Sequence, residues 1–404
     1  MNNIYKYIPS SIKKVHGSIL PLYAKDNFIF TADKKYLDLT SGIGALSTGH
    51  NHPHVIKAVN EQLTKYVHFP QQVFQTHPIQ MEVTEKIIDT MPDGLDNIFY
   101  VNSGSEAIDN AIKIARLYTG KANIISMTGG FHGRTLGALS VTSSNTACRK
   151  NVAPLMSNVY YCNDFTKKAL DTVLDFQSGA DETAAILLEP VQGECGIFSI
   201  DTEFLQYVKK KCVENNILLI ADEVQCGAMR TGTWWNIQQK DVTPDLITFG
   251  KGIASGYPFA GVIGCSDIMN SLSPGNLGGT YGGNAICSAA ASATIDILNK
   301  VEFRDNIIQN GLYIRNNLID EPLIRDIRQH GLMIGIEFIT SDDNPSITCN
   351  ILEKLRDNGI LVLFAGNKNQ YIRLLPCLNI SRDDINIFID IFKKILNDTA
   401  IPLH

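Results

Sequence analysis

Short apolar runs, each about the length of a strand, recur through the middle of this chain and show little alternation of polar and apolar residues. Strands that are buried on both faces have this pattern, as in a parallel sheet that helices cover on each side. The intervening segments carry apolar residues at helical spacing, as at Ile108, Ala111, Ile112 and Ala115. The alternation predicts an α/β fold. The expected strands span residues 97–101, 123–127, 158–162, 184–188, 217–221, 246–249 and 261–265.

The two ends of the chain do not follow this alternation. After about residue 285 the pattern is mostly helical, with strand-like segments at 332–338 and 371–375 and an amphipathic helix at 385–396. No internal repeat or low-complexity tract occurs. The expected organisation is an N-terminal segment that packs on the smaller domain, a large domain, and a small α+β domain, over residues 1–44, 45–285 and 286–404.

Composition excludes several classes of function. The 404 residues include 35 Lys and Arg against 41 Asp and Glu, and no long basic run occurs, so we expect no nucleic-acid partner. No apolar run approaches the ~20 residues of a membrane span, and the first residues lack the apolar region of a secretory signal. Nine cysteines, an odd number without a CxxC pair, argue against a disulfide framework and a structural zinc site. We therefore expect a cytoplasmic protein with no membrane partner.

One candidate ligand site lies where the apolar run NIFYV meets a predicted helix, at Asn102, Ser103, Gly104 and Ser105. A helix N-terminus offers unpaired N–H groups and the positive end of the helix dipole, and Gly104 allows close approach of the backbone. The segment can therefore seat an anion such as phosphate. The alternative is an ordinary helix cap, in which Ser103 is the cap and Glu106 completes a capping box. Taken alone, the segment favours the cap.

Two further candidates also follow apolar runs. ILLIA leads directly into Asp222, and LITF ends in Gly250-Lys251-Gly252. Ligands of open α/β sheets bind beyond the carboxyl ends of the strands, so Asp222 is placed to face one; the alternative is an acid that caps a turn. Desolvation at a strand end would lower the pKa of Lys251 and make its amine nucleophilic, whereas the alternative is a lysine that extends from a turn into solvent.

The three signals gain weight together because they lie in one α/β domain. Pyridoxal phosphate needs a phosphate cradle, an acid for its pyridinium nitrogen and a lysine for its aldehyde. The combination predicts a site for this cofactor. The acid would keep the ring able to accept electrons, and the lysine amine would move a proton between substrate and cofactor.

Eight ordered motifs make the chain similar to the class III, fold-type I pyridoxal-phosphate aminotransferases, which include the 4-aminobutyrate, acetylornithine and ornithine aminotransferases. The resemblance runs from about Tyr36 to the end of the chain. It implies a large domain with a mostly parallel seven-stranded sheet and a smaller α+β domain. The matching strings are YLDLTSGIGALSTGHNHP, NSGSEAIDNAIKIAR, GGFHGRTLGALSVT, LLEPVQGECG, LLIADEVQCGAMRTG, PDLITFGKGIASGYP, GGTYGGN and YIRLLPCLNI.

The resemblance also implies the residues that hold the cofactor. Lys251 matches the Schiff-base lysine and Asp222 the partner of the pyridinium nitrogen. Phe131 matches the aromatic ring that stacks on the cofactor; His132 beside it either lies near the cofactor or is a buried structural histidine. The remaining positions match residues that cradle the phosphate, pack on the ring or reach its phenolic oxygen, and they are Ser103, Gly104, Ser105, Val224 and Gln225.

Thr280 matches the residue that reaches the phosphate in the neighbouring subunit. This match implies a homodimer with shared active sites, or a tetramer built from such dimers.

Four residues match substrate-binding positions of the family. Arg373 resembles the arginine that grips the α-carboxylate of an amino acid or of 2-oxoglutarate, and Glu194 resembles the gate that pairs with it. A buried arginine without a partner is costly, so a glutamate that neutralises it lets one site also accept an amine without an α-carboxylate. Arg134 sits where the enzymes for ω-amino acids hold the distal carboxylate, and Ile43 where they shape the pocket.

Some positions depart from the family pattern. Cys226, Met229, Ala285 and Cys377 replace residues that are usual there, and these changes bear on substrate preference more than on activity. The histidines of GHNHPH match a turn that holds no metal in the family, so we expect no metal site.

The preferred hypothesis is ping-pong transamination of an ω-amino acid, with 4-aminobutyrate as the best single donor and 2-oxoglutarate as the acceptor, through a Schiff base at Lys251. Acetylornithine or ornithine transamination is the closest alternative. A second alternative is an amino acid racemase or epimerase, because a few members of the family move a proton without transamination. A non-catalytic regulatory protein fits less well, because no DNA-binding segment is attached and both Lys251 and Asp222 are present.

Overall fold

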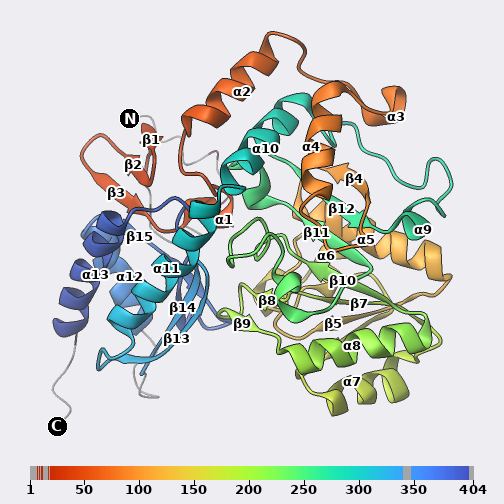
Figure 1. Cartoon of the computed structure of the whole chain (residues 1–404). Coiled ribbons are helices and arrows are strands. Elements are labelled where there is room, and N and C mark those ends of the chain that lie inside the picture. The colour runs from red at the N-terminus through yellow and green to blue at the C-terminus, as the bar shows by residue number, and fades with distance from the viewer. Residues whose placement is uncertain are drawn as a thin grey trace.

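A seven-stranded sheet forms the centre of the larger part of the molecule, on the right in Figure 1. The computed structural model describes residues 19–339 and 347–399, with positions 7, 9, 11 and 17 in addition. Along the sheet the order is β4-β12-β11-β10-β7-β5-β6, and only β12 runs antiparallel to its neighbours. The strands are β4 (Asn97–Val101), β5 (Asn123–Met127), β6 (Val159–Cys162), β7 (Thr183–Leu188), β10 (Leu218–Asp222), β11 (Leu246–Phe249) and β12 (Ala260–Gly264). The α/β fold predicted from the apolar runs and the mostly parallel seven-stranded sheet implied by the family resemblance are thereby confirmed.

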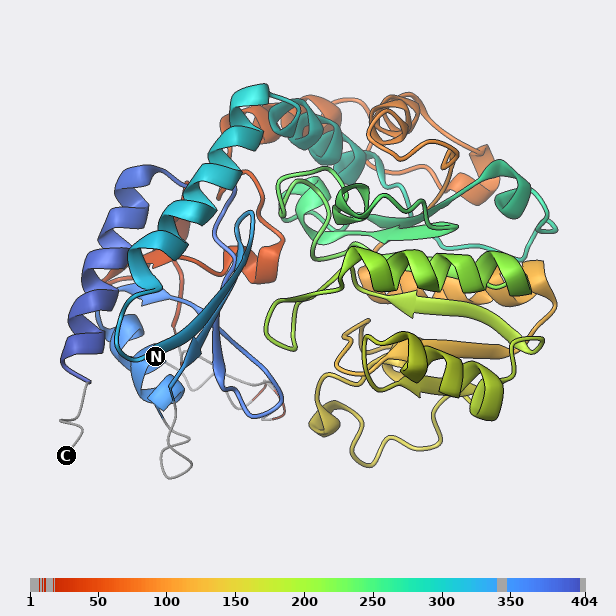
Figure 2. The ribbon, with the colours of Figure 1, turned by 60° about the horizontal axis from the view of Figure 1, so that its bottom comes forward.

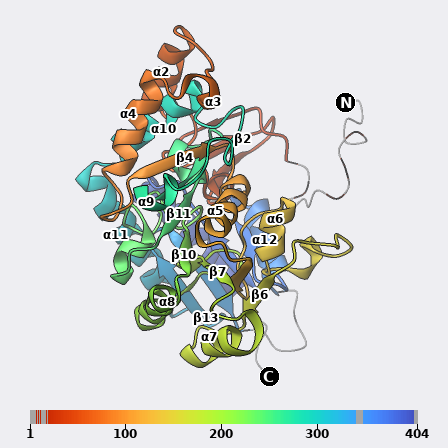
Figure 3. The ribbon, with the colours of Figure 1, turned by 90° about the vertical axis from the view of Figure 1, so that its right-hand side faces the viewer.

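Helices cover both faces of this sheet, which explains why its strands are apolar without alternation. In β10 the side chains of Leu218 and Ile220 pack with α5 and α6, while those of Leu219 and Ala221 pack on the other face with α7 and α8. Figure 3 shows the strands between these two pairs of helices. The helices around the sheet are α2 (Pro53–Leu63), α3 (Gln71–Phe74), α4 (Pro78–Ile88), α5 (Gly104–Thr119), α6 (Leu136–Val141), α7 (Lys167–Val173), α8 (Thr202–Asn215), α9 (Ser266–Met269) and α10 (Ala285–Leu298).

The rest of the chain builds a second, smaller group of elements beside the sheet domain (Figure 2). Its antiparallel sheet has the order β13-β14-β17-β16, and three helices pack on its core. The elements are α11 (Val301–Leu318), α12 (Ile347–Asp357), α13 (Arg382–Asn397), β13 (Ile324–His330), β14 (Met333–Phe338), β16 (Leu363–Ala365) and β17 (Tyr371–Leu374).

The N-terminal segment contributes strands to this smaller group. β3 pairs in parallel with β15, with Leu37 opposite Ile360, in a sheet of order β1-β2-β3-β15. The strands are β1 (Tyr23–Lys25), β2 (Phe28–Phe30), β3 (Lys35–Asp38) and β15 (Ile360–Leu361). Most of the first 18 residues of the predicted segment lie outside the described residues.

The packing of helix α10 indicates where the large domain ends, a boundary that we predicted near residue 285. It packs on α2 and α4, and its residues Ala291 and Ile295 belong to the core of the large sheet. We therefore propose that the boundary follows α10, after Leu298. Within the part of the chain that the structure describes, no helix combines the length and the apolar character needed to cross a bilayer.

Candidate active site

The carboxyl ends of five parallel strands meet at one edge of the large sheet. β4 leads into Ser103, β7 into Glu189, and β11 into Lys251, while β10 ends at Asp222 and β5 leads toward Phe131. Because parallel strands end on the same side, the topology alone brings these side chains to one edge. The predicted anion seat, acid and lysine therefore share a site.

Close backbone contacts join these segments. A Cβ atom at position 104 would lie 2.8 Å from Val224 Cγ1, and one at position 250 would lie 3.7 Å from the Gly104 nitrogen and 3.6 Å from the same Val224 methyl. Gly104 is therefore required by its contact with Val224 and not by its dihedral angles. The start of α5, the residues after Asp222 and the residue before Lys251 touch one another.

The N-terminus of α5 is capped but keeps free donors. Ser103 Oγ accepts a hydrogen bond from the Glu106 nitrogen at 3.3 Å, as a cap does. The expected capping box is wrong in its second half, since Glu106 Oε2 accepts from the Asn102 nitrogen at 2.7 Å instead of from the cap residue. The N–H groups of Gly104 and Ser105 in the first turn have no carbonyl within the helix, so they are available to an anion.

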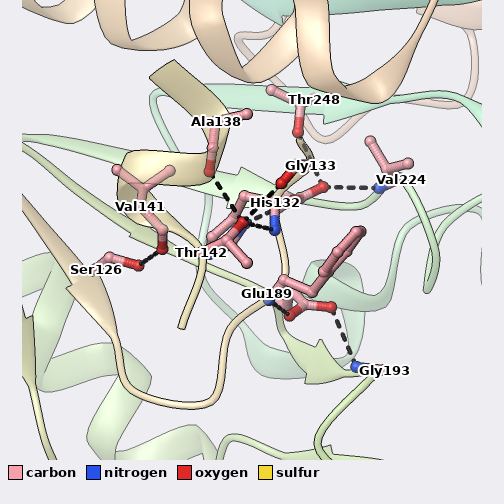
Figure 4. A network of polar contacts seen from close by, with 12 residues as sticks. Ser126, His132, Gly133, Ala138, Val141, Thr142, Glu189, Gly193, Val224 and Thr248 are labelled. Carbon is pink, nitrogen blue, oxygen red and sulfur yellow. Dashed lines mark hydrogen bonds and ion pairs between the residues drawn. The ribbon is translucent and has the colours of Figure 1, made fainter. Parts of the chain in front are cut away.

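Asp222 is held in one orientation by three partners. It is 4% exposed; its Oδ1 accepts from the Val224 nitrogen and from Thr248 Oγ1, both at 3.1 Å, and its Oδ2 lies 2.7 Å from His132 Nδ1. Figure 4 labels His132, Thr248 and Val224 in this network. The backbone nitrogen of His132 donates a hydrogen bond to Thr142 Oγ1 at 2.9 Å. His132 thus orients the carboxylate, in addition to being buried.

Lys251 has an unusual backbone conformation. It has a φ of +46°, in the left-handed region, which a residue other than glycine adopts at a cost of roughly 1–3 kcal/mol. Its neighbour Gly252 is fixed by Ser47, whose hydroxyl donates to the Gly252 carbonyl at 2.5 Å. Burial lowers the pKa of the Lys251 amine below its ordinary value; the charge of Glu194 opposes this effect and that of Arg373 adds to it. A larger fraction of the amine is therefore neutral and nucleophilic near neutral pH.

The buried side chain of Glu189 joins two loops of the site, although the sequence did not identify it as a site residue. Glu189 accepts from the Phe131 nitrogen at 2.8 Å and from the Gly193 nitrogen at 3.1 Å, so it ties the loop of the stacking ring to the loop of the predicted gate (Figure 4). Burial raises the pKa of Glu189 to about 7. Its sequence signal was its place directly after the apolar run AAILL, the same signal that identified Asp222.

The predicted gate and the predicted carboxylate grip form an ion pair. Arg373 lies on β17, its side chain is 3% exposed, and its Nη1 is 2.7 Å from Glu194 Oε1. The same Nη1 donates to Gln225 Oε1 at 3.1 Å, while Nε is buried without a hydrogen-bond partner among the described residues. This orphan donor fits a site in which the guanidinium also binds a carboxylate from elsewhere.

Ile43, Arg134 and Thr280, which complete the predicted set of site residues, are all exposed. Ile43 lies on the turn α1 (Ser41–Gly44), where residues 41–44 all have positive φ, and it is 49% exposed. Arg134 is exposed, with its guanidinium 5.8 Å from the centre of the Phe131 ring and its nitrogen donating to Ser105 Oγ at 3.3 Å. Thr280 is exposed and makes no recorded contact with the other site residues of its own chain.

The positions that depart from the family pattern are buried. Cys226 donates to Glu223 Oε2 at 3.0 Å, and burial raises the pKa of its thiol well above the ordinary value. Met229 has a φ of +66°, a conformation that suits the glycine usual there. Ala285 begins α10, and Cys377 follows β17. All nine cysteines are unpaired.

The histidines of GHNHPH have structural partners. His50 Nε2 lies 3.0 Å from Asp38 Oδ2, His52 caps α2, and His54 Nε2 lies 3.6 Å from Asp296. Among the described residues no group of three or more His, Cys, Asp or Glu side chains is arranged to hold a metal ion.

Comparison with known proteins assigns most of the chain to one family profile. The profile described as Aminotransferase class-III matches residues 13–396. The 5-aminovalerate aminotransferase DavT of Pseudomonas putida is 35% identical over 386 residues, 91% of each chain. The 4-aminobutyrate aminotransferase GabT of Escherichia coli is 35% identical over 414 residues, 97% of this chain and 96% of the relative. The acetylornithine aminotransferase of Bacillus cereus is 36% identical over 367 residues, 90% of each chain.

A solved structure has the same fold over nearly the whole chain. The ornithine aminotransferase of Toxoplasma gondii superposes with a TM-score of 0.88 at 26% sequence identity, covering 98% of this chain and 93% of that one. The relatives thus differ in the amines they are named for, while the transamination chemistry is common to them.

Proposed function

Because this chain belongs to the class-III aminotransferases, we propose that it transfers the amino group of an ω-amino acid to 2-oxoglutarate, with 4-aminobutyrate as the preferred donor. One observation carries this proposal: the 2.7 Å pair between Glu194 and Arg373. A 2-oxo acid has a carboxylate beside its reacting carbon, which Arg373 can bind in a bidentate manner. An ω-amine has none, and Glu194 then supplies the negative charge that the buried guanidinium needs.

The residues of the site fit pyridoxal phosphate. The first-turn N–H groups of Gly104 and Ser105 suit its phosphate, the fixed carboxylate of Asp222 suits its pyridinium nitrogen, and the Lys251 amine suits its aldehyde. When bound, this cofactor supplies an aldehyde that carries the amino group and a ring that withdraws electrons from the substrate. We propose that Val224 and Phe131 pack on that ring and that Gln225 reaches its phenolic oxygen.

The chain itself contributes charge, orientation and proton transfer. The Asp222 side chain is held in one orientation because Val224, Thr248 and His132 contact its oxygens. Lys251 Nζ, whose pKa is lowered by burial, would take a proton from the substrate carbon that bears the amino group and pass it to the cofactor, not back to that carbon. We propose that Arg134, which is exposed beside Phe131, holds the distal carboxylate of the donor.

A second donor class is supported by a specific comparison. The relative from Bacillus cereus, at 36% identity, is named for acetylornithine, and that identity equals or slightly exceeds the values for the relatives named for ω-amino acids. An amino acid racemase or epimerase is the remaining alternative.

We further propose a cytoplasmic homodimer with shared active sites. Thr280 is exposed, and large apolar side chains are exposed on the neighbouring elements α3 and α4 and beside Thr280. Exposed apolar side chains in one region suit an interface between subunits. They are Val73, Phe74, Met81 and Tyr281.

The test is a half-reaction on the purified holoenzyme. Single amines are added without an oxo acid while the visible absorption band of the bound cofactor is followed. We expect 4-aminobutyrate to bleach the band and 2-oxoglutarate to restore it. If only acetylornithine or ornithine bleaches the band, the donor assignment is wrong. If no amine bleaches it and an α-amino acid instead exchanges its Cα proton with solvent, the racemase reading replaces transamination.

A further inference from the structure

The loop that carries Glu194 belongs to the large domain, but the smaller domain holds its backbone. This gate loop, residues 193–197, joins β8 (Val191–Gln192) to β9 (Phe198–Ser199). The Glu194 carbonyl accepts from the Gly366 nitrogen at 2.7 Å, and the Gly196 carbonyl accepts from Arg328 Nε at 2.6 Å. Both donors come from the smaller domain.

Arg328 is held by two aromatic rings, two carboxylates and the Gly196 carbonyl, while its Nη2 is buried without a hydrogen-bond partner among the described residues. Its guanidinium lies 4.3 Å from the ring centre of Phe198 and 4.6 Å from that of Tyr371. These two rings meet edge to face with their centres 6.1 Å apart, so the guanidinium packs against both of them. Its Nη1 is 2.7 Å from Glu337 and 3.1 Å from Asp326, and its side chain is only 14% exposed. A planar guanidinium that is packed and hydrogen-bonded in this way has little freedom to move.

The strand register places Arg328 and Arg373 in one row across the sheet. Arg328 on β13 is paired with Gly335 on β14, and Gly335 is paired with Arg373 on β17. Residues paired across antiparallel strands share a face, so both arginines rise from the same face on either side of Gly335. A Cβ atom at position 335 would lie 2.7 Å from the Gly196 carbonyl, which shows that the gate loop lies directly over this glycine.

The gate loop has almost no room to shift on this face. Gly196 has a φ of +123°, and a Cβ atom there would lie 2.6 Å from the Tyr371 ring. Ile197, with a φ of +64°, is fully buried in a cluster with Val191, Met333 and Leu375. The conformation of the loop is therefore imposed by its contacts. Only the side chain of Glu194, which is 30% exposed, is free to move away from Arg373.

We propose that Arg328 is a positioning residue for Glu194 and thereby sets how well the site handles a donor without an α-carboxylate relative to a 2-oxo acid. This inference rests on the proposed function of the Glu194–Arg373 pair. Arg328 holds the loop backbone by its hydrogen bond to the Gly196 carbonyl. It packs on Phe198, the first residue after the loop. It also packs on Tyr371, two residues before Arg373 on the same strand face. The backbone at Glu194 is therefore held in a position from which its carboxylate reaches Arg373.

Loss of Arg328 should affect the two half-reactions unequally. The donor half-reaction needs Glu194 against Arg373, because the ω-amine brings no charge to that position. The acceptor half-reaction needs Arg373 alone, because 2-oxoglutarate brings its own carboxylate and displaces Glu194. A looser gate loop should therefore slow the donor half-reaction and leave the acceptor half-reaction nearly unchanged.

The decisive experiment compares Arg328→Gln with Arg325→Gln in the holoenzyme. Arg325 lies on the same strand and contacts the same Glu337, at 3.4 Å, but it is exposed and makes no recorded contact with the gate loop. The second-order rate constants are measured separately for 4-aminobutyrate and for 2-oxoglutarate. In Arg328→Gln we expect the donor constant to fall about tenfold relative to the acceptor constant, the size expected for one lost charged hydrogen bond. Arg325→Gln should keep the wild-type ratio, and Arg328→Lys, which keeps the charge but not the planar guanidinium, should restore the ratio in part.

A double-variant cycle tests whether Arg328 acts through Glu194. In a Glu194→Gln background, Arg328→Gln should no longer change the ratio of the two constants. A change of the same size without Glu194, or an equal loss in both half-reactions of the single variant, would overturn the proposal.

Hydrogen exchange of residues 193–198 separates this inference from the donor assignment. If wild-type protein does not react with 4-aminobutyrate, the proposed donor is wrong, yet exchange still tests the loop contact. We expect these amides to exchange at least tenfold faster in Arg328→Gln than in Arg325→Gln, because two of the loop's anchors are lost. Equal exchange in the two variants would contradict the role of Arg328.

Discussion

At the scale of single residues, Asp222 and Glu223 are adjacent carboxylates with different tasks. Asp222 faces the site, whereas Glu223 points away from it and accepts from the Ile237 nitrogen at 2.7 Å and the Asn236 nitrogen at 3.0 Å. Successive residues at a strand end point in opposite directions, which separates the two roles. Burial raises the pKa of Glu223 from 4.5 to about 7.

This raised pKa predicts a pH dependence of stability. Between about pH 4.5 and 7 the folded protein keeps a proton on Glu223 that the unfolded chain releases, so the free energy of unfolding falls as the pH rises through this window. The contribution is on the order of 3 kcal/mol, present at the acidic end and lost above pH 7. Glu223→Gln cannot titrate, so its unfolding midpoint should decline less than that of the wild type between pH 5 and 7.5 in thermal denaturation. Parallel midpoint curves for the two proteins would show that Glu223 does not titrate in this range.

Residues of the site differed in how far the sequence could identify them. Asp222 and Lys251 were found because each ends an apolar run, and the end of a buried strand is visible in composition alone. Glu189 carries the same signal but was not assigned, because a strand end does not reveal which backbone nitrogens its acid will meet. The contact between Glu106 and Asn102 was also missed, since two adjacent N–H groups compete for one carboxylate.

At the scale of elements, helices α5 and α8 are each followed by a residue in the left-handed conformation, so opposite substitutions at these two positions test the same effect. α5 ends at Gly120 with a φ of +69°, and α8 ends at Asn216 with a φ of +51°. A Cβ atom at position 120 would meet nothing within 4 Å, so only the backbone conformation opposes a side chain there. Gly120→Ala should therefore lower the free energy of unfolding by about 1 kcal/mol, and Asn216→Gly should raise it by about 0.5 kcal/mol. Urea denaturation of both variants measures these changes; a neutral Gly120→Ala would mean that α5 ends differently in solution.

The positions of the strands in the sequence were predicted better than their directions in the sheet. The seven strands of the large sheet were predicted to within one residue at each end, because burial on both faces makes each of them a continuous apolar run. The short strands β1, β2 and β3 at the N-terminus lack an apolar run of that length and were not predicted. The antiparallel course of β12 was not predicted, because it depends on the connection from β11. Residues 250–259 contain only the short 3₁₀ turn Lys251–Ala254, too little for a helical crossover between parallel strands.

At the scale of the whole molecule, the least predictable features are contacts between distant segments. Arg328 and Gly196 are 132 positions apart, and no local pattern connects them. The domain boundary was expected near residue 285 because the apolar runs stop there, yet α10 continues the core of the large sheet. Hydrophobic periodicity along the sequence predicts single helices and strands. Contacts between distant segments depend instead on how these elements pack together in the fold.

The proposed dimer leads to a prediction about which chain supplies Thr280 to a site. If Thr280 serves the partner's site, a heterodimer of Lys251→Ala and Thr280→Glu chains contains one intact site. That site combines Lys251 of the second chain with Thr280 of the first, while the other site carries both defects. A heterodimer purified through two different tags should then have about half of the wild-type activity, although each parent homodimer is inactive. If Thr280 served its own chain, each site of the heterodimer would carry one defect and no activity would return. The activity of the doubly tagged heterodimer therefore distinguishes shared sites from separate ones.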